Sequence, residues 1–115
     1  MTSEIVPIKK YKLCMGNRLK NTWNNITAIF NGYVICYGEK HRVIVYFLSE
    51  NSPVPAQYYL KDKKFAVMFV PSCERYEYTD VLRNEKSVCA YLNDTEPEKM
   101  MIMTQQEPIG QGEID

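Results

Sequence analysis

The chain has 115 residues, with 14 Lys and Arg against 14 Asp and Glu, and 45% of its residues are hydrophobic. This length and composition predict one folded domain and exclude an intrinsically disordered chain. The longest apolar runs, 43–48 and 65–70, are far shorter than the about 20 residues that a membrane helix needs. Because residues 1–10 lack the apolar segment of a secretory signal, the sequence predicts a cytoplasmic protein that does not associate with membranes.

Charge is distributed unevenly along the chain. Residues 1–45 carry seven basic and two acidic side chains, whereas residues 71–115 carry four basic and ten acidic ones. This asymmetry indicates either a basic surface for an anionic partner or two copies that dock basic half to acidic half. If folding mixes the two halves in space, no charged patch results.

Most of the chain is predicted to form short strands, because Val, Ile, Tyr, Phe and Thr cluster in runs between Gly, Pro, Asn and Asp. The pair Asn31-Gly32 is typical of a type I′ hairpin turn, and residues 16–25 are expected to form a polar connection. Residues 42–48 form a β-rich run that is nearly unbroken in apolarity, which predicts a central strand covered on both faces. The other strands are expected over residues 5–15, 26–30, 33–37, 56–60, 65–70, 87–92 and 100–104.

One helix is predicted near residues 73–84, where Ser72 is a suitable N-cap and apolar residues recur at spacings of three and four. Many strands with one helix predict a mostly β, α+β fold: a small curled antiparallel sheet or open barrel with one packed helix. An oligonucleotide-binding barrel is one compatible shape. Residues 1–104 are expected to form this domain, and residues 105–115 an acidic C-terminal tail.

The cysteines do not predict a metal site. Cys14, Cys36, Cys73 and Cys89 contain no Cys-x-x-Cys spacing, and one histidine cannot complete the usual zinc ligand sets. In a reducing compartment these thiols are expected to behave as small buried hydrophobes. The sequence therefore predicts neither a metal nor another cofactor.

No catalytic motif is present. His41 could act as a general base, oriented by Glu39 two positions away, but no nucleophile accompanies it. The acids Glu74, Glu77 and Asp80 match the dipole of the predicted helix. The sequence therefore favours a non-enzymatic protein, and a small hydrolase that uses His41 and Glu39 remains a third hypothesis.

The nine tyrosines are the most informative feature for function, because Tyr offers a large rigid ring with a polar tip. Several of them interleave with Lys and Arg, as a groove that stacks nucleic-acid bases requires. They could equally pack on half-buried strands without a binding role. The candidate binding residues are Lys9, Lys10, Lys12, Tyr33, Tyr37, Arg42 and Tyr58.

Two functions remain open. The first is a small binding module that self-associates or binds another protein through Tyr-rich strands and the acidic tail, where Glu107, Glu113 and Asp115 make the contacts. The second is a protein that binds single-stranded nucleic acid or a nucleotide-like ligand through basic and aromatic residues of the N-terminal half. The zero net charge argues against general duplex binding.

Overall fold

The computed structural model describes residues 3–104 and has the predicted mostly β, α+β class. One α-helix, α1 (Arg75–Asn84), lies where the sequence predicts it. Short 3-10 helices η1 (Lys61–Lys63), η2 (Ser72–Glu74) and η3 (Pro97–Lys99) connect other elements. The strands are β1 (Ser3–Pro7), β2 (Lys10–Trp23), β3 (Ile26–Tyr37), β4 (Arg42–Leu48), β5 (Tyr58–Leu60), β6 (Phe65–Pro71), β7 (Val88–Asn93) and β8 (Met101–Thr104).

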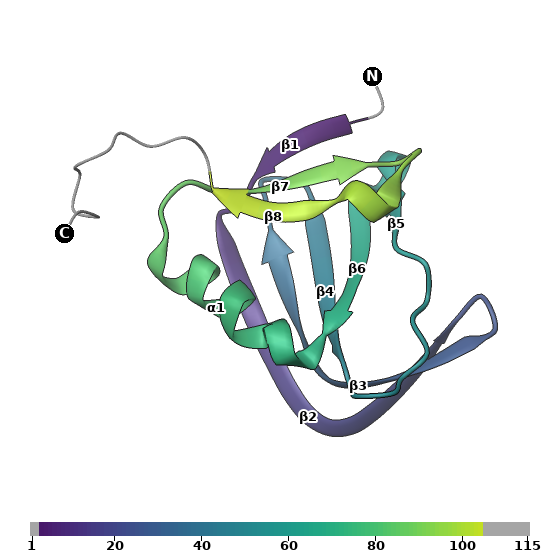
Figure 1. Cartoon of the computed structure of the whole chain (residues 1–115). Coiled ribbons are helices and arrows are strands. Elements are labelled where there is room, and N and C mark those ends of the chain that lie inside the picture. The colour runs from purple at the N-terminus through teal and green to yellow at the C-terminus, as the bar shows by residue number, and fades with distance from the viewer. Residues whose placement is uncertain (1–2, 105–115) are drawn as a thin grey trace.

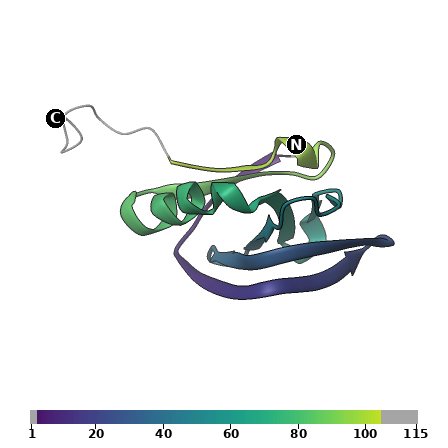
Figure 2. The same ribbon diagram turned by 60° about the horizontal axis from the view of Figure 1, so that its bottom comes forward.

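The strands form two packed sheets (Figure 1). One has three strands in the order β1-β7-β8, and the other has five in the order β2-β3-β4-β6-β5. Within the larger sheet β4 and β6 run parallel, so it is mixed and not purely antiparallel as expected. A parallel pair needs a crossover, which residues 49–64 provide. Figure 2 shows α1 and the three-stranded sheet together on one side of the five-stranded sheet.

The main core fills the space between the sheets. Ala90 and Leu92 of the three-stranded sheet pack in the same cluster as buried residues of β3, β4 and β6, and α1 adds Tyr78 and Leu82. Burial raises the pKa of the Cys36 thiol to about 12. Cys36 and Cys89 are buried as predicted, whereas Cys73 is exposed. The remaining core residues of this cluster are Val6, Val34, Val43, Val45, Phe47, Tyr59, Ala66, Met68, Val70 and Met100.

The chain passes from one sheet to the other at Ile8 and Lys9. The Ile8 amide donates to the carbonyl of Val88 in the three-stranded sheet, and the Lys9 amide donates to the carbonyl of Tyr37 in the five-stranded sheet. The single strand expected over 5–15 is therefore two strands in two sheets.

The first hairpin turns at a different place from the predicted one. β2 and β3 form an antiparallel pair whose turn is Asn24-Asn25, with φ angles of 49° and 68°. A type I′ turn needs positive φ at both central residues, which Asn tolerates better than most side chains. The predicted turn at Asn31-Gly32 is wrong, and the expected polar connection over 16–25 is mostly the second half of β2.

Asn31 instead forms an irregularity within β3. Phe30 pairs with Leu48 and Gly32 pairs with Phe47, so Asn31 is an extra residue. One extra residue reverses the alternation of side chains between the two faces of a sheet. Phe30 and Leu48 therefore lie in a second apolar cluster, on the side of the sheet away from the main core.

A second irregularity between Met15 and Leu19 of β2 lies in the same hairpin. We call the part beyond these two irregularities, residues 19–30, the arm. The loop after β4 holds it, since the Ile29 amide donates to Ser52 Oγ at 2.9 Å and the Ser49 amide donates to the Ile29 carbonyl at 2.8 Å.

The helix starts without the predicted cap. Residues 72–74 first form η2, and the N-cap position of α1 is Glu74, whose side chain makes no capping hydrogen bond. Ser72 is therefore one turn too early to cap α1. Across residues 3–104, no helix has both the length and the apolarity needed to cross a membrane.

Candidate functional site: an aromatic and basic sheet face

The outer face of the five-stranded sheet is the side turned away from the three-stranded sheet. Residues that lie opposite each other on neighbouring strands point to the same face, so the register arranges this face in rows. The first row contains Lys10, Tyr37, Arg42, Phe65 and Leu60; the second contains Lys12, Ile35, Ile44, Val67 and Tyr58; the third contains Cys14, Tyr33, Tyr46 and Phe69.

The first row alternates cations with rings, and we call it the cation–ring row. Lys10 Nζ lies 5.6 Å from the ring centroid of Tyr37, and the guanidinium carbon of Arg42 lies 5.2 Å from that of Phe65. Both cations are exposed and both rings are half-buried. Because strands are spaced about 4.8 Å apart, the backbones that carry the two rings lie about 10 Å from each other across the sheet.

The arm covers the third row. The ring of Trp23 lies 4.8 Å from Tyr46 and 4.9 Å from Phe69, centroid to centroid, and the rings of Tyr46 and Phe69 are stacked at 5.6 Å. Burial raises the pKa of the Tyr46 hydroxyl, and contact with the Cys14 thiol raises that of Tyr33. This end of the face is a packed aromatic cluster with protonated hydroxyls, whereas the cation–ring row is its open end.

Six of the seven predicted binding residues lie on this outer face: Lys10, Lys12, Tyr33, Tyr37, Arg42 and Tyr58. Lys9 does not, since its side chain lines a groove at the end of the sheet. The predicted tail contacts Glu107, Glu113 and Asp115 lie outside the described residues.

Four aromatic residues of this face are not among the candidate binding residues of the sequence: Phe65, Phe69, Tyr46 and Trp23. Phe65 and Phe69 alternate with Val67 along β6, a period-two pattern that marks one face of a strand. Tyr46 and Trp23 carry no comparable signal, because their positions depend on the pairing of β3 with β4 and on the bend of the arm.

Three titratable side chains meet beside the cation–ring row. The Tyr59 hydroxyl donates to Glu4 Oε2 at 2.6 Å, and His41 Nε2 lies 3.3 Å from Glu4 Oε1. The Tyr59 hydrogen bond and the nearby His41 hold the pKa of Glu4 below its ordinary value. Burial and the Glu4 carboxylate raise the pKa of Tyr59. The carboxylate beside the His41 imidazole is therefore that of Glu4 of β1, whereas the sequence suggested Glu39.

This cluster forms one wall of a groove of about 280 Å³. Lys9, Lys40 and Lys64 reach it from three separate segments, and none of them forms a salt bridge within the described residues. We call it the lysine groove. Its full lining is Glu4, Ile5, Val6, Pro7, Lys9, Glu39, Lys40, His41 and Lys64.

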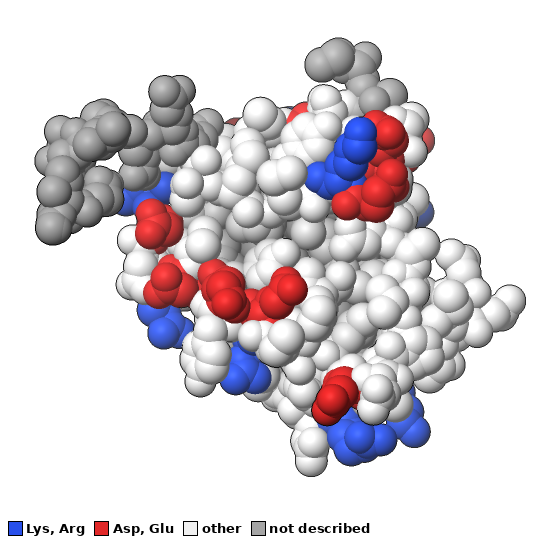
Figure 3. All heavy atoms as spheres, viewed as in Figure 1, with Lys and Arg blue, Asp and Glu red and all other residues white. Residues whose placement is uncertain are grey.

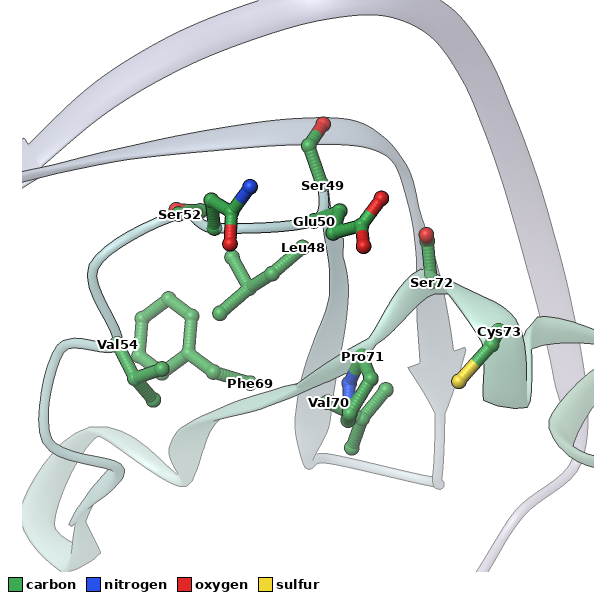
Figure 4. A pocket seen from close by; sticks show the side chains of 11 residues that line it. Leu48, Ser49, Glu50, Ser52, Val54, Phe69, Val70, Pro71, Ser72 and Cys73 are labelled. Carbon is green, nitrogen blue, oxygen red and sulfur yellow. The ribbon is translucent and has the colours of Figure 1, made fainter.

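A larger groove, about 540 Å³, lies between the loop after β4 and the start of α1 (Figure 4). Leu48, Val54 and Phe69 give it an apolar part, and Cys73 lies at the end formed by η2. Glu50 is the charged side chain among its lining residues, so this groove offers no cation to an anionic ligand. It holds none of the predicted binding residues.

The outer face of the three-stranded sheet differs in chemistry. Ile5 and Met101 lie in one row with Tyr91 and are 56% and 47% exposed. The next row is Pro7, Cys89 and Met103, so neither row carries a charge. Figure 3 shows largely uncharged atoms over β7 and β8, with acidic side chains gathered on α1 and near the connection between these strands.

Among residues 3–104, no group of three or more His, Cys, Asp or Glu side chains is arranged to hold a metal ion. Comparison of the chain with protein families, with curated proteins and with solved structures finds no significant match.

Proposed function

We propose that this chain is a non-enzymatic binding protein whose outer sheet face binds single-stranded nucleic acid in the cytoplasm. The observation that carries the proposal is the cation–ring row, in which Lys10, Tyr37, Arg42 and Phe65 come from four adjacent strands. Proteins that bind single strands without sequence readout combine flat rings for base stacking with a positive surface for the phosphates.

The chemistry of the row fits that task. Tyr37 and Phe65 are flat rings of the kind on which any base can stack, and such stacking is worth about 1 to 3 kcal/mol per base. Lys10 and Arg42, together with Lys12 in the second row, supply three positive charges. No acidic side chain occurs in the three rows of this face, so a polyanion meets no like charge there.

The direct experiment is fluorescence anisotropy with a labelled oligothymidylate of about ten nucleotides, within the range that one small β domain covers. Tyr37→Ala should weaken binding about 5- to 150-fold, the effect of losing one stacked base.

Tyr76→Ala is the matched control. Tyr76 is 73% exposed on α1, and its ring also lies beside a guanidinium, that of Arg75, at 5.1 Å. This variant should bind like the unmodified chain. Equal weakening by both substitutions, or no binding of the oligonucleotide at all, would reject the outer face as the binding surface.

A second candidate function is self-association through the outer face of the three-stranded sheet. The uncharged rows with exposed Ile5 and Met101 favour it, because two such faces can meet without burying a charge. Native mass spectrometry of the full chain tests it. A dimer that Met101→Lys converts to monomer supports this candidate, and a monomer at all concentrations rejects it.

A further inference from the structure

The lysine groove lies directly beside the cation–ring row. Lys9, His41 and Lys64 of the groove each precede a residue of the row, namely Lys10, Arg42 and Phe65. The Arg42 amide also donates to the Lys64 carbonyl at 2.9 Å, which ties the two sites together. The groove, which β1 of the three-stranded sheet also lines, therefore adjoins the end of the outer face where β4 and β6 begin.

The groove is built for an anion. Its lining contains three lysines and two glutamates, Glu4 and Glu39, so basic side chains outnumber carboxylates. The Glu4 carboxylate already accepts a hydrogen bond from the Tyr59 hydroxyl, so part of its charge is offset inside the protein. The positive charge of the lining suits a doubly charged anion, and the three lysines come from three separate segments of the chain.

We propose that the lysine groove binds the terminal phosphate of the single strand that lies on the cation–ring row. This inference rests on the proposed function and adds to it a preference for strand ends. A terminal phosphate monoester carries a charge of about −1.5 to −2 at neutral pH, whereas each internal phosphodiester carries a single negative charge. Several ammonium groups around one phosphate therefore favour the monoester.

The test compares three oligothymidylates of equal length with the full chain: one without a terminal phosphate, one with a 5′-phosphate and one with a 3′-phosphate. One phosphorylated end should raise affinity about tenfold, as new charge-assisted hydrogen bonds form. The gain should shrink below about pH 6, where the phosphate becomes a monoanion.

Two substitutions test whether the increase in affinity from a terminal phosphate depends on the lysine groove. Lys40→Gln removes an exposed charge, and Lys64→Asn removes another while suiting the left-handed backbone at that position, where φ is 54°. Each substitution should abolish most of the increase in affinity that the terminal phosphate gives. The affinity for the unphosphorylated strand should stay within about twofold of that of the unmodified chain. Lys99→Gln is the control, because Lys99 lies on η3 and pairs with Glu96.

The outcomes separate this inference from the proposed function. Equal binding of all three oligonucleotides would overturn the terminal-phosphate site while the outer face remains a binding surface. A gain that persists in Lys40→Gln and Lys64→Asn would also overturn it, since the phosphate would then bind elsewhere. Failure of all three oligonucleotides to bind would reject the proposed function and this inference with it.

Discussion

The guanidinium of Arg42 stacks beside the ring of Phe65, with 5.2 Å between the guanidinium carbon and the ring centroid. The two residues are neighbours because β4 and β6 pair in parallel, with Arg42 opposite Phe65. A cation beside a ring is attracted by the ring's quadrupole, so this contact favours the two side chains lying together at the surface. The candidate site is thus a product of the sheet topology.

The arm is expected to depend on Trp23. Trp23→Ala removes the ring contacts with Tyr46 and Phe69 and should lower the free energy of unfolding by about 2 to 3 kcal/mol, less than for a fully buried Trp because this side chain is half-buried. Urea denaturation followed by circular dichroism measures the change. Trp23→Phe keeps a ring and should recover more than half of the loss. An alanine variant as stable as the unmodified chain would show that the arm does not rest on this contact.

Gly32 is expected to be needed where β2 leaves no room for a side chain on β3. A Cβ added there would lie 2.5 Å from the Cys14 carbonyl oxygen and 2.7 Å from Met15 Sδ. Because a backbone atom cannot move aside without disturbing the pair of strands, Gly32→Ala should destabilise the fold by about 1 to 3 kcal/mol.

Gly16→Ala provides the comparison for Gly32→Ala. A Cβ at Gly16 meets the flexible end of the Leu19 side chain, at 2.8 Å. Gly16→Ala should therefore lower the stability less than Gly32→Ala does. Thermal unfolding of the two variants under the same conditions shows which is less stable. The reverse order would contradict the described register of the hairpin.

The contact between Tyr59 and Glu4 is expected to stabilise the packing of β1 against β5. Tyr59→Phe removes the 2.6 Å hydrogen bond and should cost about 1 to 2 kcal/mol, since the acceptor is charged. Tyr76→Phe, which alters an exposed hydroxyl, should change the stability by less than about 0.5 kcal/mol. Chemical denaturation at neutral pH distinguishes the two, and equal effects would argue against the hydrogen bond.

The same contact predicts how stability depends on pH. Folding lowers the pKa of Glu4 below its ordinary value of 4.5. Its contribution is therefore complete above pH 4.5 and is lost as the pH falls through the lower, folded value. Glu4→Gln should therefore reduce the fall in the free energy of unfolding below pH 4.5, which we call the acid limb of the stability curve. An unchanged acid limb would assign it to other carboxylates.

The parts of the fold that the sequence predicts are those with strong local patterns. The β-rich run 42–48 is β4 residue for residue, and it is central as expected, between β3 and β6. The pair 56–60 and 65–70 is an antiparallel hairpin, as β5 and β6. The change to a helical period near residue 73 marks α1. In each case the signal lies within the segment itself.

The errors arise where distant pairing decides the structure. Asn31-Gly32 is a good turn pair, yet Gly32 pairs with Phe47 inside a continuous strand and Asn24-Asn25 makes the turn instead. The outer face likewise needs the register across five strands. Lys10, Tyr37 and Arg42 were each candidates from the sequence, but only the pairing places them in one row.

The salt dependence of binding tests the central claim most directly. Contact of Lys10, Lys12 and Arg42 with phosphates releases counterions, so the logarithm of the association constant for oligothymidylate should fall with the logarithm of salt concentration at a slope of about −2 between about 50 and 200 mM. Arg42→Gln should reduce the magnitude of this slope by about 0.7, whereas Arg83→Gln on α1 should leave it unchanged. A flat salt dependence, or equal slopes for the two variants, would contradict binding of single-stranded nucleic acid on this face.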